Sequence, residues 1–477
     1  MQTTVIYVRK DDPCEDFLNS LALSSKRLYN RVLFLIRNVM TGLAKPENER
    51  HELEQEAIDD VCRGLENARQ SLILKGKTPE GLDNPTPESP NLSYRKLEAA
   101  LRYMEDSDYR SLPAHTAQHV IKKVCEAMKS FYGDMKAYAE KPSAFAGKPK
   151  LPKYLRKDKY VVPFTNQTAT LKEKDGKYYI EFPKSGKLRI CLGDGSAING
   201  RYIKAEAVPE GERIKLCVTY ESDETEINIP KQPKRILGID TGVDNFAAGT
   251  FNFDAAPFII SGKYLKSENR RYNMVKGRLR SELDRDPGAG KTSHRLESLS
   301  VRHSNRMRDF MYKAAHSICR IAAKEKADVI VIGKNPGIKN AMSMGKQNNQ
   351  NFQYIPFAKF CNILKLVSER KYGIPVVIRE ESYTSQASLK DGDCIPTYGT
   401  DDKNASFSGK RKYRGLYEYS DGTEVNADIN AAGNILRKEY PDAFSGISDF
   451  SFLSRTIRRI DEYDLFSNKN VSALKSV

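Results

Sequence analysis

From about residue 231 the sequence alternates short apolar runs with long amphipathic segments. Two apolar runs close together in sequence come first, and further runs separated by helical patterns follow. The apolar runs that predict strands are RILGIDTGVDNFAAGTF (235–251), APFIISGKYL (256–265), DVIVIG (328–333) and IPVVIRE (374–380). Helical patterns lie at 293–327, 356–373 and 429–440. Antiparallel-type strands followed by helix-separated strands are typical of an α/β domain of the ribonuclease H-like kind.

Acidic residues follow several of these elements. Asp240 ends an apolar strand, where a carboxylate is costly unless it pairs with a cation such as a metal ion, although it could instead begin a turn. Asp428 precedes a helix whose Ala431 and Ala432 permit close approach to the sheet, and an ordinary N-cap is the alternative. Glu380 and Glu381 end another strand and point to opposite faces, so only one of them can join a central site.

Three carboxylates at strand ends can hold two Mg²⁺ ions about 4 Å apart, an arrangement that hydrolyses phosphodiesters without a nucleophilic side chain. The residue after the buried strand 328–332 is Gly333, however, and the next residue is Lys334. This strand end therefore offers no carboxylate, and the central question is whether the site is complete.

Composition favours a polyanionic partner. The 477 residues carry 78 Lys and Arg against 62 acidic residues, a formal charge of +16. No apolar run approaches the roughly 20 residues that span a bilayer, and no signal peptide opens the chain. The eight cysteines form no Cys-x-x-Cys pair, so we expect reduced residues in the cytoplasm, with neither disulfides nor a zinc site.

The first half has a different organisation. Helical patterns dominate up to about residue 140, beginning with a stripe formed by Leu18, Leu21, Leu28, Val32, Leu33 and Ile36. A Pro-punctuated basic segment follows, in which Lys148, Lys150 and Lys153 could contact a nucleic-acid backbone, although a solvated connector has the same composition. From residue 160 to about 230 the period becomes two, with an Asp-Gly hairpin turn at 175–176, which predicts a small β domain.

Many ordered blocks resemble a known family, the transposon-encoded TnpB (OrfB) proteins, compact RNA-guided DNA endonucleases related to type V CRISPR effectors. The blocks run through nearly the whole chain and include SSKRLYNRVLFLIRN, GKPKLPKYLRKDKYVVPFTNQ, GIDTGVDNFA, NNQNFQYIPFAKF, ESYTSQAS and GKRKYRGLYEYSDGTEVNADINAAGNIL. The resemblance implies a RuvC-like nuclease domain of RNase H-like fold, plus a recognition lobe made of a helical bundle and a wedge β-barrel of the oligonucleotide-binding type. The implied domains are a first wedge strand (1–12), a helical recognition domain (13–140), the wedge barrel with its basic linker (141–230), a first nuclease part (231–384), a zinc-ribbon-like insertion (385–424) and a last nuclease part with a C-terminal tail (425–477).

The resemblance also implies roles for individual residues. Asp240 and Asp428 match the first and third acids that bind Mg²⁺. Gly333 stands where the family's commonest second acid would be, and Glu381 fits the place of an alternative glutamate on the next strand, with Glu380 as the less favoured neighbour. The insertion lacks the zinc cysteines of most members, so no zinc is expected. Arg414 matches an arginine that similar proteins direct at the site, which implies a phosphate clamp, although an exposed loop arginine is the alternative. Contacts with nucleic acid are also expected from Arg411 and Lys334, although Lys334 could equally belong to a plain solvated loop.

The leading hypothesis is therefore a Mg²⁺-dependent, RNA-guided endonuclease that acts in a prokaryotic cytoplasm with a guide RNA and double-stranded DNA as partners. It would recognise a short target-adjacent motif, and a transposase encoded at the same locus would be a partner without stable binding. Two alternatives stay open. One is a nuclease-dead, RNA-guided repressor, motivated by Gly333, and the other is an RNase H-like transposase, because the same acids serve strand transfer.

Overall fold

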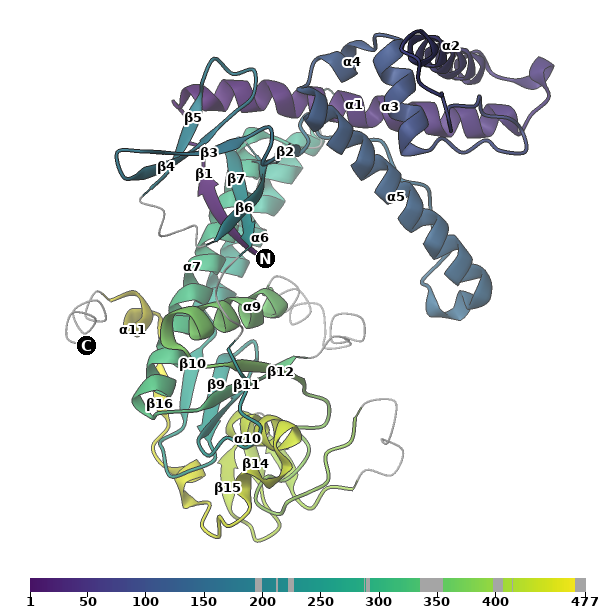
Figure 1. Cartoon of the computed structure of the whole chain (residues 1–477). Helices are drawn as coiled ribbons and strands as arrows, with labels where there is room; N and C mark the ends of the chain where they lie inside the picture. Colours follow the sequence, from purple (N-terminus) through teal and green to yellow (C-terminus); the bar gives the residue numbers. More distant parts are fainter. Residues whose placement is uncertain are drawn as a thin grey trace. The chain divides into compact units, whose positions relative to one another are not determined.

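The computed structural model places the chain in two compact units, Met1–Glu224 and Thr225–Val477, which are described separately (Figure 1). The residues that the structure describes are 1–193, 200–211, 213–221, 227–286, 288, 292–334, 355–397, 406–413 and 415–467.

The first unit begins with a strand and then a set of helices. The helices are α1 (Pro13–Leu43), η1 (Glu47–Glu49), α2 (Glu52–Leu74), α3 (Tyr94–Tyr103), α4 (Ser107–Arg110), α5 (Ala114–Glu140) and η2 (Pro142–Ala144). The apolar stripe predicted for the first helix is confirmed, because all six of its residues are buried in α1. Asp12 caps α1 by accepting a hydrogen bond from the Cys14 backbone N–H at 2.8 Å.

An arginine outside that stripe joins three helices. Arg31 of α1 donates to Asp60 of α2 at 2.7 Å and to Asp106, the N-cap of α4, at 3.1 Å. Because both acids are largely buried, these charge-assisted bonds fix the spacing of the helices around the apolar core.

The strands of the first unit form two sheets. They are β1 (Gln2–Tyr7), β2 (Val162–Thr165), β3 (Thr170–Lys174), β4 (Lys177–Glu181), β5 (Arg189–Gly193), β6 (Arg201–Glu210) and β7 (Arg213–Glu221), in the orders β1-β7-β6-β2 and β3-β4-β5. The predicted Asp-Gly turn between β3 and β4 is confirmed, with positive φ at both Asp175 and Gly176. The closed wedge barrel and the domain limits given above stay predictions.

The second unit is built on one six-stranded sheet of order β12-β11-β8-β9-β10-β16. Its strands are β8 (Ile236–Asp240), β9 (Asn245–Phe251), β10 (Phe258–Ser261), β11 (Val329–Lys334), β12 (Val376–Glu380) and β16 (Arg458–Ile460). The helices and helical turns are α6 (Lys263–Asp284), α7 (His294–Lys324), α9 (Phe357–Val367), η3 (Ser368–Tyr372), α10 (Ala427–Glu439), η5 (Pro441–Phe444), η6 (Ser451–Ser454) and α11 (Glu462–Phe466). A small sheet holds β13 (Lys410–Tyr413), β14 (Leu416–Glu418) and β15 (Glu424–Asn426).

The strand directions confirm the RNase H-like nuclease fold predicted from the element order. β8, β9 and β10 form an antiparallel meander, whereas β11 and β12 are parallel to β8 and to each other. Helices α7 and α9 cover one face of the sheet and α10 covers the other, with a separate apolar core on each side (Figure 1). Parallel strands need such covered faces, which explains why β8 and β11 are almost wholly apolar.

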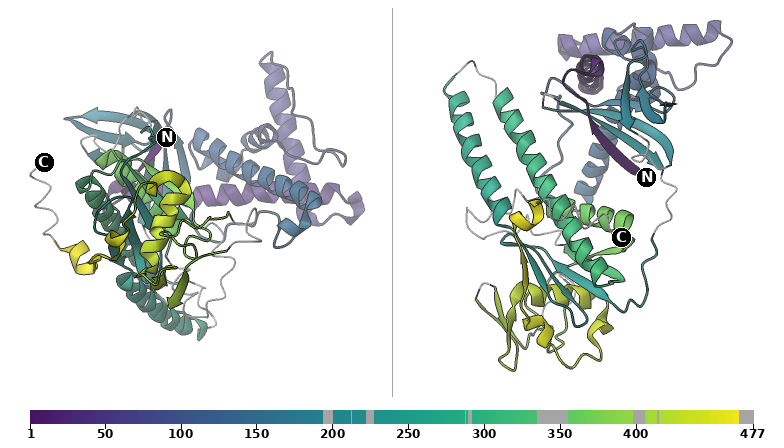
Figure 2. Two further views of the ribbon diagram at one scale, coloured as in Figure 1. Left: turned by 90° about the horizontal axis from the view of Figure 1, so that it is seen from below. Right: turned by 90° about the vertical axis from the view of Figure 1, so that its left-hand side faces the viewer.

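One boundary predicted from the sequence is wrong. The run 256–265 was interpreted as a single strand, but β10 ends at Ser261 and α6 begins at Lys263. Helix α6 packs along α7 as an antiparallel partner (Figure 2). Its buried Leu265, Tyr272 and Leu279 recur every seven residues and form the seam.

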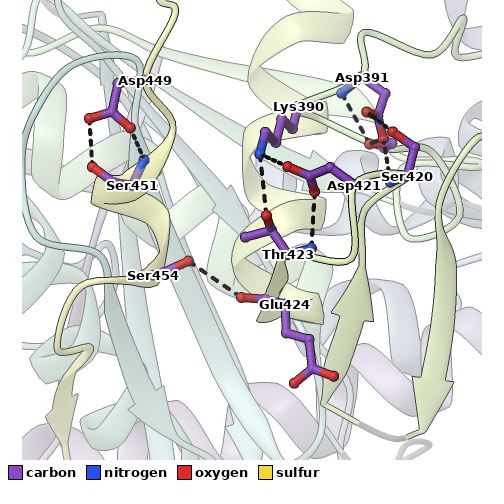
Figure 3. Close-up of polar contacts among 10 residues, drawn as sticks. Lys390, Asp391, Ser420, Asp421, Thr423, Glu424, Asp449, Ser451 and Ser454 are labelled. Carbon is purple, nitrogen blue, oxygen red and sulfur yellow. Dashed lines mark hydrogen bonds and ion pairs between the residues drawn. The ribbon is translucent and has the colours of Figure 1, made fainter.

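The insertion between β12 and α10 is held together by carboxylates and hydroxyl groups (Figure 3). Asp391 accepts a hydrogen bond from Ser388 Oγ at 2.5 Å and one from Ser420 Oγ at 2.6 Å, which joins the beginning of the insertion to its end. Lys390 forms an ion pair with Asp421 close by. The donors on serine more than offset the effect of burial and lower the pKa of Asp391, so this group stays ionised and polar at neutral pH.

Candidate active site

The carboxyl ends of three neighbouring strands lie at one edge of the large sheet. β8 ends at Asp240, and the adjacent parallel β11 ends at Lys334, which pairs with Glu380 at the end of β12. Glu381 is the first residue after β12. Parallel neighbours terminate together, so residues more than 100 positions apart in sequence arrive at the same edge.

Helix α10 carries Asp428 to this edge. Its N-cap is Asn426, whose side-chain oxygen accepts from the backbone N–H groups of Asp428 and Ile429. The alternative in which Asp428 is itself the cap is therefore wrong, and its carboxylate remains available. The predicted close approach of α10 is confirmed, since a Cβ at Gly238 of β8 would lie 2.3 Å from the Ala432 carbonyl oxygen.

The charges at this edge interact strongly. Burial, and then the nearby charges of Glu381 and Asp428, raise the pKa of Asp240 well above its usual range, against smaller opposing effects of the Thr241 N–H and Arg411. Burial, and then the charge of Glu380, raise the pKa of Glu381 to about 7 against the opposing effect of Lys438. Like charges crowded in a partly dry site favour protonation unless a cation is present.

Of the two adjacent glutamates, only Glu381 is among the charges that raise the pKa of Asp240. Glu380 is directed to Lys438, whose Nζ lies 2.5 Å from its Oε2, and it also accepts from Ser382. Burial would raise the pKa of Glu380, but these donors more than offset that effect and lower it. Because successive side chains at the end of a strand point to opposite faces, Glu380 lies on Lys438 while Oε2 of Glu381 has no partner among the described residues.

Glu381 lies over Gly333. A Cβ built on Gly333 would be 2.6 Å from Glu381 Oε2 and 2.6 Å from Ile435 Cδ1. Oε2 of Glu381 is buried, and within the described ranges of the chain it has no hydrogen-bond partner. The strand end without a carboxylate is thus filled by a carboxylate from the next strand.

Asp428 has two polar neighbours, and no sequence pattern indicated one of them, Asn245. The Nδ2 amide of Asn245 donates to Asp428 Oδ2 at 2.6 Å, and the Arg411 guanidinium lies 3.6 Å from Oδ1. Arg411 was expected to contact nucleic acid, and the structure places it beside the acids. Arg414, expected as a phosphate clamp, lies outside the described residues.

The three carboxylates have the chemistry of a site for hard cations, because Mg²⁺ prefers oxygen ligands. The raised pKa values of Asp240 and Glu381, together with the unpartnered oxygen of Glu381, fit such an ion. As the side chains stand in the described part of the chain, no three His, Cys, Asp or Glu side chains are close enough together to hold a metal ion.

The remaining basic residues predicted to bind nucleic acid are exposed. Lys334 ends β11 at the edge just described, while Lys148, Lys150 and Lys153 belong to the first unit. Their segment is anchored to α1, because the Asn30 side chain exchanges two hydrogen bonds with the Leu155 backbone, at 2.8 and 3.1 Å. In the part of the chain that the structure describes, no helix is both long and apolar enough to cross a bilayer.

The strand order of the large sheet and the acidic residues at its edge together place the second unit in the class of RNase H-like nuclease folds. More particularly, residues 215–339 match the family model of a probable transposase, OrfB_IS605, and residues 357–435 match the Cas12f1-like TNB domain. The resemblance to the transposon-associated TnpB (OrfB) proteins and to type V effectors is thereby confirmed. Among curated proteins there is no match.

Several solved structures are similar at low identity. A cryo-EM structure of the Cas12f1-sgRNA-target DNA complex is 15% identical, covers 85% of this chain and 82% of that chain, and has a TM-score of 0.42. A CRISPR-Cas12f ternary complex is 16% identical over 84% of this chain and 80% of that chain, with a TM-score of 0.31. CasPhi-2 (Cas12j) bound to crRNA is 10% identical over 94% and 98%, respectively, with a TM-score of 0.30. These scores are too low to define a common arrangement, so the fold assignment rests on the strand order.

Proposed function

We propose that the protein is an RNA-guided DNA endonuclease of a transposable element, with Asp240, Glu381 and Asp428 as the metal-binding acids. The observation that carries this proposal is the approach of Glu381 and Asp428 to Asp240 at one edge of the sheet, which raises the pKa of Asp240. Structural ion pairs rarely leave a buried carboxylate without a partner, whereas metal sites regularly do.

In the proposed mechanism Asp240, Glu381 and Asp428 would hold Mg²⁺, and the bound metal would supply Lewis-acid activation of a water for phosphodiester hydrolysis. Asn245 and Arg411 orient the Asp428 carboxylate by contacts with its two different oxygens. The ion pair with Lys438 holds the Glu380 carboxylate on the lysine and offsets its negative charge.

The first unit is proposed to be the recognition lobe that holds a structural guide RNA, while guide pairing reads double-stranded DNA. The net charge of +16 and the exposed Lys148, Lys150 and Lys153 support contacts with phosphate. Binding should then weaken steeply with salt, because phosphate contacts release counterions. A flat response to salt would count against these contacts. No zinc is required for this role, and a transposase from the same locus would act without stable binding.

Two other functions rest on particular observations. A nuclease-dead, RNA-guided repressor is favoured by Gly333, which leaves the usual position of the second acid without a carboxylate. A transposase that transfers strands is favoured by the description of the family matched at 215–339. The first would bind its target without cutting, and the second would join DNA ends without needing RNA.

One experiment separates the three functions. The protein is purified with the RNA transcribed from its own locus, and the complex is incubated with a randomised-motif DNA library and Mg²⁺. RNA-dependent cleavage beside one enriched motif supports the endonuclease, and motif-specific binding without cleavage supports the repressor. Strand joining, or cleavage that persists after the RNA is removed, would overturn the proposal.

A further inference from the structure

A cavity of about 530 Å³ opens at the same edge of the large sheet as the acids. Its lining includes Asn245, which begins β9, and Ser261, which ends β10 and pairs with Asn245 across the two strands. β9 is antiparallel to β8, so its first residue lies at the edge where β8 ends in Asp240. The cavity therefore continues the acidic edge toward β10 and β16.

Asn245 is common to the acidic site and the cavity. Its amide donates to Asp428 at 2.6 Å, and it also lines the cavity wall. Neighbouring strands are about 4.8 Å apart, so β10 lies roughly 10 Å from β8. A dinucleotide spans this distance, which means that a strand cut at Asp240 would carry a flanking nucleotide over the cavity.

Two cations at the cavity are available for a ligand. Lys263 and Arg459 line it, and neither forms an ion pair with another described residue, whereas the lining Lys266 is paired with Asp244 at 2.5 Å. Of the remaining acids, Asp461 is already used to cap α11, where it accepts from the Asp464 N–H at 3.1 Å. Glu462 is exposed at the rim.

The remaining lining is apolar. Ile259 and Ile460 are buried and contribute to the wall, while acids and bases balance in number around it. A cavity without net charge offers little electrostatic binding energy to a free, highly charged anion. A nucleotide within a chain fits better, because it combines one phosphate charge with a large, flat, mostly neutral base.

We propose that this cavity binds the nucleotide next to the scissile phosphodiester of a single DNA strand, with its phosphate on Lys263 and Arg459 and its base in the rest of the cavity. This subsite rests on the proposed nuclease function and adds a place where the strand is held for cutting. The subsite would position the strand across Asp240. A strand that is already held on both sides of the reacting phosphate has less entropy to lose on reaching the transition state than a freely moving strand.

Kinetics of the full chain with its guide RNA test the subsite. The double variant K263Q/R459Q should lower the cleavage rate at limiting DNA by roughly 10-fold or more, since it removes two charge-assisted contacts with phosphate. Loss of accuracy should accompany this effect, with cut positions spread over neighbouring phosphates. The control R280Q removes an exposed cation from the same helix, about 25 Å further along α6. Equal rates and equal cut positions in the double variant and R280Q would overturn the proposal.

A second measurement does not depend on cleavage. A photoreactive nucleotide is placed at successive positions of the target strand and crosslinked to the D240A protein in its complex with RNA and DNA. Crosslinks to peptides that contain Ser261 or Arg459 support the subsite, even if the wild-type chain never cuts, in which case only the proposed nuclease function fails. Crosslinks confined to other peptides, in a wild-type chain that does cut, would refute the subsite alone.

Discussion

The Glu381 carboxylate fills the space that a side chain at position 333 would need, since a Cβ on Gly333 would lie 2.6 Å from Glu381 Oε2. Gly333 is the last residue but one of β11, and Glu381 directly follows the neighbouring parallel strand β12, at the edge that also bears Asp240. A carboxylate on either strand can reach the same region, but side chains at both positions collide. The glycine is therefore best understood as the space that lets Glu381 point inward.

This overlap predicts a non-additive effect of substitution. G333A should lower the free energy of unfolding by roughly 1–3 kcal/mol and reduce cleavage, because the added methyl displaces Glu381 and presses on Ile435. In an E381A background the same change should cost less, and a double-mutant cycle by denaturant unfolding measures the difference. Strictly additive costs would show that the two side chains do not compete.

Substituting the acids should separate cleavage from binding. D240A, E381A and D428A should each reduce Mg²⁺-dependent cleavage by more than about 100-fold, because losing even an outer partner of a metal ligand costs about that much. Binding of RNA and target, measured by filter retention, should change little. E380Q is the matched control and should keep most of the activity. Cleavage that survives E381A but not E380Q would identify the other glutamate as the ligand.

Stability without metal should fall as the pH rises through the weakly acidic range. The pKa of Glu381 is about 7 in the folded protein against an ordinary value of 4.5, so the native state binds more protons than the unfolded state between these values. Raising the pH across that window should therefore cost roughly 1–3 kcal/mol in chelator. Denaturant titrations from pH 4.5 to 7.5 test this slope. E381Q should flatten it, and Mg²⁺ should stabilise the protein most at the upper end.

Lys438 should be needed for both stability and the position of Glu381. Its side chain is only 5% exposed, and its ammonium donates to Glu380 Oε2 and to the carbonyl oxygens of Ser382 and Pro396. K438M leaves these acceptors unsatisfied and should lower the free energy of unfolding by about 1–3 kcal/mol and reduce cleavage. K438R should restore part of both, and thermal melts with cleavage assays measure the two effects. Unchanged cleavage in a destabilised K438M would limit the lysine to a structural role.

The insertion should keep its structure without zinc. A zinc chelator should leave the thermal midpoint unchanged, because carboxylate and hydroxyl groups join its two ends. D391A should lower the free energy of unfolding by about 1–3 kcal/mol, since it removes the acceptor for both Ser388 and Ser420. D449A is the control, since the hydrogen bonds found for Asp449 all go to Ser451, two residues along. A midpoint that falls in chelator would contradict this expectation.

Much of the nuclease fold could be predicted because its determinants are local. The apolar runs of β8 and β11 indicate buried strands, and the small residues at 431–433 indicate a helix that packs closely on the sheet. The candidate acids could be named because they follow such elements. The choice between Glu380 and Glu381 needed the resemblance to the family, since alternation alone makes the two equivalent.

Other features depend on contacts that sequence order hides. Asn245 and Asp428 are 183 positions apart in the sequence, and Lys438 and Glu380 are 58 positions apart, so no local sequence pattern predicts either contact. The start of α6 is hidden in the sequence because Tyr264 and Leu265 continue the apolar composition of the preceding strand. Its seven-residue repeat of Leu265, Tyr272 and Leu279 was the available signal.

The contact of α10 with β8 also has a consequence for the synthesis of the protein. Asp240 and Asp428 belong to segments that the ribosome makes nearly 200 residues apart, and the space above Gly238 is closed by Ala432 only when the later segment folds back. A nascent or prematurely terminated chain that lacks α10 retains the first carboxylate but cannot assemble the acidic edge. Assembly of the acidic edge is thus withheld until helix α10 has been translated.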